Sequence, residues 1–244
     1  YLFYTIIRNQ GRLLAASVRP KRMIEGMKRY KKFPAYNTWA ALLNTSTQHL
    51  PVWILAFYFT NSVIGHFALV RSLLGIPMWL VGMSIAQVFY QKAAEVYGTG
   101  KPLKPIVEKI TDRLVALGLL PFCILVIISE EAFLLFFGTR WMESGKIAQV
   151  LAVLFFFQFL SSPLSNLFNV LEKQVQNFTF NILLILFRSG GLVFGGLCES
   201  IYLSLLLYSL FSSIIYIAMP VYLLIRSGST AMYFLEVLLR YILI

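Results

Sequence analysis

Long apolar runs separated by short polar links make up most of the chain. A membrane-spanning α-helix needs about 20 mostly apolar residues, and six runs approach or exceed that length. They lie at residues 37–59, 63–90, 114–129, 147–170, 178–197 and 202–225. The pattern predicts an all-α fold: a polytopic membrane helical bundle whose six transmembrane helices form one lobe of a two-lobed transporter.

The two ends of the chain differ from this central region. Residues 1–33 combine the end of a preceding membrane helix with a basic connector, and the six-helix lobe then occupies residues 34–226. Residues 227–244 are expected to form either an interfacial helix or the start of a further span. The chain begins at Tyr1 without a secretory signal peptide, so we expect an N-terminal lobe of the same protein upstream.

Composition and charge indicate a membrane protein. The chain is 59% hydrophobic and 13% charged, whereas soluble domains average about 25% charged residues. Its net charge of +11 does not indicate nucleic-acid binding, because the basic residues gather in two predicted loops, residues 8–32 and 92–113. Basic loops favour the cytoplasmic side of a membrane, so we predict that both loops are cytoplasmic.

Two arginines, Arg71 and Arg188, interrupt the apolar runs. An arginine near the bilayer centre costs about 2.5–3.5 kcal/mol, so such a residue usually faces the protein interior or a water-filled cavity. The six spans contain no Asp or Glu that could pair with either arginine. Because a guanidinium stays charged and can donate two parallel hydrogen bonds to a phosphate, we predict that Arg71 and Arg188 bind the anionic head group of a substrate.

Several uncharged polar side chains share the predicted depth of these arginines. Depths are counted at 1.5 Å per residue from the external ends of four spans. They range from about 12 Å for Arg71 to about 17 Å for Gln158, with Arg188, Gln48 and His49 between them. A central cavity requires such a common depth. We therefore predict a second, weaker group of polar cavity residues, which are Gln48, His49 and Gln158. Asn44 joins this group because it shares one helical face with Gln48, and such a face could contact sugar hydroxyls.

Structural roles are the alternative for all of these residues. The arginines could reach the external surface or cap helix carbonyls, and the polar run at residues 44–49 could hydrogen-bond to neighbouring helices. No group of Cys, His, Asp and Glu has metal-ligand spacing, and no nucleophile–base pair stands out. We therefore expect no metal, no cofactor and no catalytic residue.

Four stretches of the chain resemble a known family of membrane proteins. They are RYKKFPAYNTWAALLN (29–44), GIPMWLVGMSIAQVFYQKAAE (75–95), LLFFGTRWMESG (134–145) and SSPLSNLFNVLEKQ (161–174). In this order they resemble the C-terminal lobe of bacterial polysaccharide-biosynthesis membrane proteins. These are O-antigen and capsule flippases of the multidrug/oligosaccharidyl-lipid/polysaccharide exporter superfamily. The resemblance extends from about residue 25 to about residue 225.

This resemblance implies a flippase in the bacterial inner membrane. Such a protein moves an undecaprenyl-diphosphate-linked oligosaccharide across the membrane by alternating access between two lobes. The implied partners are the lipid-linked oligosaccharide, membrane lipids and the N-terminal lobe, with no nucleic acid. Arg71 and Arg188 would meet the diphosphate, and they are assigned by depth and charge because no fixed family motif contains them.

Three other functions are open at this point. A multidrug or metabolite exporter of the same superfamily is the first alternative, although cation exporters usually need carboxylates within the membrane. A membrane-embedded glycan polymerase or ligase would need a large external loop, and the predicted external links are short. A scaffold that transports nothing would not need arginines at this depth. We therefore expect a transporter and not an enzyme.

Overall fold

The computed structural model describes residues 32–243, so the predicted helix end and basic connector at residues 1–31 lie outside the described residues. In the first part of α3 it includes the side chains of Trp39, Leu42, Thr45 and Ser46, and then those from Gln48 onward. All regular structure in this range is helical, which confirms the predicted all-α class. The elements are α3 (Lys32–Tyr58), α4 (Asn61–Pro77), η1 (Met78–Gly82), α5 (Met83–Gly98), α6 (Lys104–Phe137), η2 (Thr139–Trp141), α7 (Met142–Leu164), α8 (Leu167–Val170), α9 (Gln174–Leu197), α10 (Ile201–Arg226) and α11 (Ala231–Ile242).

Five helical segments in the described range are long and apolar enough to cross a membrane. They are Asn61–Gly98, Lys104–Phe137, Thr139–Val170, Gln174–Leu197 and Ile201–Arg226. The first of the six predicted spans corresponds to α3, which has 27 residues but is not among these five. Its polar run at residues 44–49, NTSTQH, makes it less apolar than the other segments. Residues 32–243 therefore form a multi-pass membrane protein with five candidate spans.

The prediction that residues 92–113 form a loop is wrong. Only residues 99–103 lie outside helices there, because α5 continues to Gly98 and α6 begins at Lys104. The span predicted over residues 114–129 is correspondingly longer, and its helix continues to Phe137. Lysine, arginine and glutamate have high helix propensity, and their long side chains reach water from the end of a helix. Charged residues at these helix ends were therefore mistaken for loop residues.

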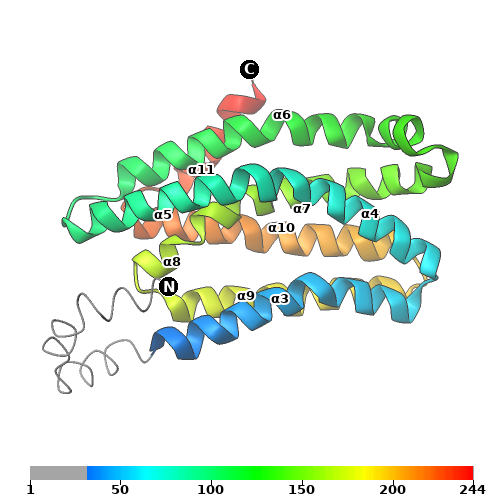
Figure 1. Cartoon of the computed structure of the whole chain (residues 1–244), viewed down its shortest axis with the longest axis horizontal. Helices are drawn as coiled ribbons and strands as arrows, with labels where there is room; N and C mark the ends of the chain where they lie inside the picture. The colour runs from blue at the N-terminus through cyan, green and yellow to red at the C-terminus, as the bar shows by residue number, and fades with distance from the viewer. Residues whose placement is uncertain (1–31, 244) are drawn as a thin grey trace, which may run out of the picture.

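The long helices run side by side along the longest axis of the molecule (Figure 1). α7 lies within the bundle and packs against α4, α6 and α10, with most of its side chains buried. α3 packs mainly against α9, which in turn packs against α10. The loop 99–103 and α8 lie at one end of the bundle, on the left of Figure 1. We call this end the basic end, and it is the predicted cytoplasmic end.

Glycines bring α9 close to its two neighbours. A Cβ atom at Gly195 would collide with the backbone and side chain of Ser204 on α10. A Cβ atom at Gly196 would collide with the ring of Tyr58 on α3. Small residues allow membrane helices to approach closely in this way, so these glycines set the spacing of α3, α9 and α10.

A π-helical turn, η1, joins α4 to α5 without a loop. It begins directly after Pro77, which has no backbone N–H and cannot complete the regular hydrogen-bond ladder. Such turns correspond to one extra residue in a helix, and they are frequent at functional sites. Here the turn brings Met78 and Trp79 to the hollow described below.

Polar contacts connect three helices at the end opposite the basic end. His66 on α4 and Ser144 on α7 are hydrogen-bonded, with 2.8 Å between Nδ1 and Oγ, and the His66 ring packs edge-on against Trp141. Tyr202 at the start of α10 donates a hydrogen bond to Glu143 at the start of α7. These contacts hold α4, α7 and α10 together where the predicted external links begin.

Candidate functional site

A hollow of about 310 Å³ lies where α3, α4, η1, α5, α7, α9 and α10 meet. Its apolar lining includes Met78, Trp79, Met83 and Phe155. Its polar lining comes from five of these helices and consists of Gln48, Arg71, Gln158, Ser162, Arg188 and Tyr208. We call this space the arginine hollow.

Arg188 is almost fully buried, with 3% of its surface exposed. Its Nε donates a hydrogen bond to Ser212 Oγ and its Nη2 donates one to Tyr216 Oη, both at 3.0 Å. The guanidinium carbon also lies 5.4 Å and 5.2 Å from the ring centres of Tyr208 and Tyr216. Hydroxyl oxygens and aromatic faces thus replace part of the hydration that the cation loses on burial.

No ion pair within residues 32–243 neutralises the charge of Arg188. The ion pairs among residues 32–243 are Lys104–Glu108, Lys146–Glu143 and Arg240–Asp112, and none of them borders the arginine hollow. The second terminal nitrogen of Arg188, Nη1, donates no hydrogen bond to any described residue. The buried guanidinium therefore keeps both its charge and one N–H₂ group for a ligand.

Arg71 on α4 is half-buried and lines two adjoining hollows. The second hollow has a volume of about 540 Å³ and lies between α3 and α4, where His49 and Val52 face Ala68 and Arg71. The Arg71 side chain makes no hydrogen bond or ion pair with any residue in the described range. Its guanidinium is therefore free to bind an anion from either hollow.

The other predicted cavity residues occupy three different positions. His49 lines the second hollow and not the arginine hollow. Asn44 lies on α3, but its side chain is outside the described residues. Gln158 lies about 24 Å from the start of α7, deeper than the predicted 17 Å, because α7 already begins at Met142. The residues that the structure brings together in the arginine hollow are Gln48, Arg71, Gln158 and Arg188.

The partners of Arg188 on α10 are not predicted from the sequence. Tyr208, Ser212 and Tyr216 recur at every fourth position, so they lie on one face of the helix. All three are buried. A stripe of hydroxyl-bearing residues at helical spacing, within an otherwise apolar run, is the signal that could have identified them.

The arginine hollow combines two guanidinium groups with amides, hydroxyls and aromatic rings. Arginine binds phosphate oxygens through charge-assisted hydrogen bonds, which are about twice as strong as neutral ones. The amides of Gln48 and Gln158 can both donate to and accept from hydroxyl groups. The described residues contain no cluster of His, Cys, Asp and Glu that could hold a metal ion. The arrangement therefore suits an anionic ligand that also carries hydroxyl groups.

Comparison with known proteins gives one family. A family model described as "Polysaccharide biosynthesis protein" matches residues 1–146, which is more than half of the chain. The chain belongs to the polysaccharide biosynthesis protein family. This confirms the family predicted from the sequence motifs, a flippase-type family of membrane proteins. Searches of the curated proteins and of the solved structures give no match.

The match to the polysaccharide biosynthesis protein family covers only part of the site. It includes α3, α4, η1, α5 and α6, and with them Gln48 and Arg71. Gln158, Arg188 and all of α10 lie beyond it. The family membership supports a transporter-like protein of polysaccharide biosynthesis, whereas the roles of individual residues rest on geometry.

Proposed function

We propose that the protein is a flippase that moves an undecaprenyl-diphosphate-linked oligosaccharide across the bacterial inner membrane. The oligosaccharide would be a unit of an O-antigen, capsule or exopolysaccharide. The described chain would be the C-terminal lobe, with α3 as the first of its six spans, and an N-terminal lobe would complete the cavity. Transport would proceed by alternating access to the two sides of the membrane.

The observation that carries this proposal is the pair of arginines that line one hollow without an acidic partner in the described range. Two cations at this depth are unfavourable unless an anion compensates them. A diphosphate has enough charge and enough oxygen atoms to engage both guanidinium groups. The chain belongs to a polysaccharide biosynthesis family of flippase-type membrane proteins. A lipid-linked diphosphate is therefore the natural candidate for the anion that binds both arginines.

In this proposal each part of the substrate has its own environment. Arg71 and Arg188 bind the two phosphates, and the amides of Gln48 and Gln158 bind hydroxyl groups of the first sugars. The ring of Trp79 offers an apolar face to a sugar. The polyprenyl chain stays in the surrounding lipid, so that only the polar head passes through the protein.

Transport by purified protein tests this function. Full-length protein in liposomes is given a short-chain polyprenyl diphosphate that carries a fluorescent oligosaccharide, and a monophosphate analogue with the same sugar serves as the comparison. We expect the diphosphate to be moved at least about 10-fold faster, because a hydrogen bond to a charged group contributes about 1.5–3 kcal/mol. Equal rates for the two lipids, or no transport above that of protein-free liposomes, would contradict the proposal.

Arg71→Lys tests whether the shape of the guanidinium contributes beyond its charge. Lysine keeps the positive charge but cannot donate two parallel hydrogen bonds, so we expect transport of the diphosphate lipid to fall about 10-fold. Arg140→Lys is the matched control, because Arg140 is exposed in η2, away from the arginine hollow, and this change should leave transport unaltered. Wild-type rates for Arg71→Lys would show that bulk charge alone is sufficient.

A further inference from the structure

A groove that is separate from both hollows described above lies between α5 and α6 near the basic end. Its volume is about 530 Å³. α5 and α6 are joined by the loop 99–103 but make few direct contacts with each other, so the space between them is open. The groove is lined by apolar side chains, Ser84 and three cationic side chains, which are Lys92, Lys109 and Arg113. We call it the α5–α6 groove.

The spacing along α6 separates its charges onto two faces. The α5–α6 groove is lined by Ile106, Ile110, Arg113 and Leu117, at spacings of three or four residues, and by Lys109, four residues before Arg113. These spacings place all five on one face of α6. The acidic residues of this part of α6 lie on a different face, which packs against α11. The groove-lining face of α6 therefore carries positive charge only.

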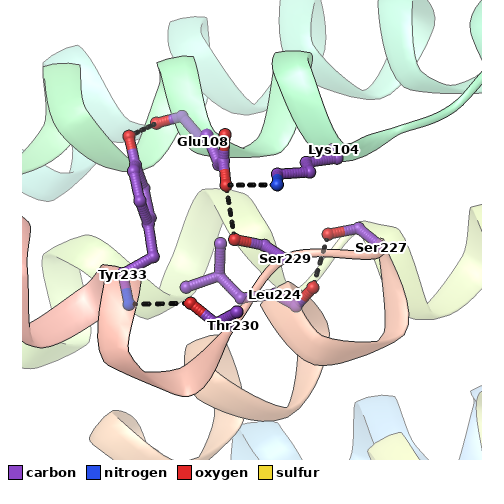
Figure 2. Close-up of polar contacts among 7 residues, drawn as sticks. All are labelled: Lys104, Glu108, Leu224, Ser227, Ser229, Thr230 and Tyr233. Carbon is purple, nitrogen blue, oxygen red and sulfur yellow. Dashed lines mark hydrogen bonds and ion pairs between the residues drawn. The ribbon is translucent and has the colours of Figure 1, made fainter.

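Glu108 and Asp112, the acidic residues of this part of α6, are already engaged by the segment that follows α10. Figure 2 shows the Glu108 carboxylate directed towards Ser229 and Lys104, with Ser229 Oγ donating a hydrogen bond to it at 2.5 Å. Tyr233 Oη donates to the backbone carbonyl of Glu108 at 3.2 Å. Burial, and then the nearby carboxylates of α6, raise the pKa of Tyr233, so its phenol stays protonated and keeps this hydrogen bond.

Asp112, one turn further along α6, is engaged in the same way. It forms an ion pair with Arg240 at 3.5 Å and accepts a hydrogen bond from Tyr241 Oη at 3.1 Å. By contrast, the groove cations Lys92, Lys109 and Arg113 form no ion pair or hydrogen bond with any described residue. The two carboxylates of this part of α6 are thus occupied elsewhere, and the nearby carboxylate of α5, Glu95, is exposed and does not line the groove.

We propose that the α5–α6 groove binds one anionic phospholipid from the leaflet at the basic end. The phosphate of its head group lies against Lys92, Lys109 and Arg113, and an acyl chain follows Ile85, Val88 and Leu117 towards the bilayer centre. Charge complementarity selects this occupant, because the cations sit at the water-facing end of an otherwise apolar groove. Basic pockets between membrane helices are known to suit anionic lipid head groups.

Lipid titration of the purified protein tests this proposal. Full-length protein is titrated with phosphatidylglycerol or with phosphatidylcholine of the same acyl chains, and bound lipid is counted by native mass spectrometry. We expect one phosphatidylglycerol to bind more than about 10-fold tighter than phosphatidylcholine. Lys109→Gln with Arg113→Gln should weaken phosphatidylglycerol binding about 30-fold, because each cation near a membrane surface contributes about 5-fold.

Two further variants separate the groove from general electrostatics. Lys101→Gln with Lys104→Gln removes the same charge from the same end but not from the groove, and it should change binding less than about 2-fold. Val88→Trp keeps all three cations but fills the apolar part of the groove, at a position that is 68% exposed, and it should displace the lipid. Equal binding of the two lipids, equal losses in the two double variants, or unchanged binding to Val88→Trp would each overturn the proposal.

Discussion

Arg188→Met is expected to abolish transport while leaving the protein folded. Transport of the diphosphate lipid should fall about 100-fold or more, because truncating a buried charge that meets an oppositely charged group costs about 2–5 kcal/mol. Stability should stay within about 1 kcal/mol of wild type. Removing a desolvated cation is favourable, but it leaves the Tyr216 hydroxyl without its partner, and these two effects oppose each other.

The measurements are transport in liposomes and thermal unfolding of the full-length protein in detergent. Arg226→Met is the matched control, because the Arg226 guanidinium also lies over a tyrosine ring, that of Tyr222 at 5.3 Å, but it does not line the arginine hollow. We expect this control to transport normally. If Arg188→Met transported at the wild-type rate, Arg188 would be a structural residue and the proposed site would lose half of its charge.

Gly195→Ala is expected to destabilise the bundle by about 2 kcal/mol or more. Its Cβ atom would collide with the backbone of Ser204, and backbone cannot move aside as a flexible side chain can. Overpacking of this kind typically costs about 1–3 kcal/mol. The change would push α9 away from α10 and so weaken the contacts of Arg188 with Ser212 and Tyr216.

Gly190→Ala, on the same helix, is the matched control for this effect. Apart from the neighbouring residues and backbone of α9 itself, no atom lies within 4 Å of a Cβ placed at Gly190, so the added methyl group meets no other helix. Alanine is favoured over glycine in a helix by about 1 kcal/mol, so this variant should be as stable as wild type or more stable. Thermal unfolding compares the two variants, and equal melting temperatures would contradict the role assigned to the glycine face.

Five of the six predicted spans correspond to candidate spans of the described structure, and they were predictable because their signal is local. A run of about 20 apolar residues needs no knowledge of its neighbours to be identified as a membrane helix. The ends of the helices were less predictable, as the extension of α6 to Lys104 and Phe137 shows. Charged residues occur both in loops and at the water-facing ends of long helices, and composition alone does not separate these two cases.

The candidate site was predictable only in part, for a related reason. Arg71 and Arg188 stand out because a charge inside an apolar run is unfavourable by itself. Tyr208 and Tyr216 do not stand out, because aromatic residues are ordinary members of an apolar run. Their importance arises only when α9 and α10 pack so closely that both rings lie against one guanidinium. That approach depends on glycines whose effect is seen only in three dimensions.

The π turn after Pro77 sets the direction in which the side chains of α5 point relative to those of α4. One additional residue turns the rest of a helix by about 100°. Before η1, Arg71 and Gly75 line the arginine hollow; after it, Ser84, Val88 and Lys92 line the α5–α6 groove. Deleting a single residue from Met78–Gly82 would therefore turn Lys92 away from the groove without touching Arg71. The orientation of the α5–α6 groove relative to the arginine hollow therefore depends on the five residues of η1.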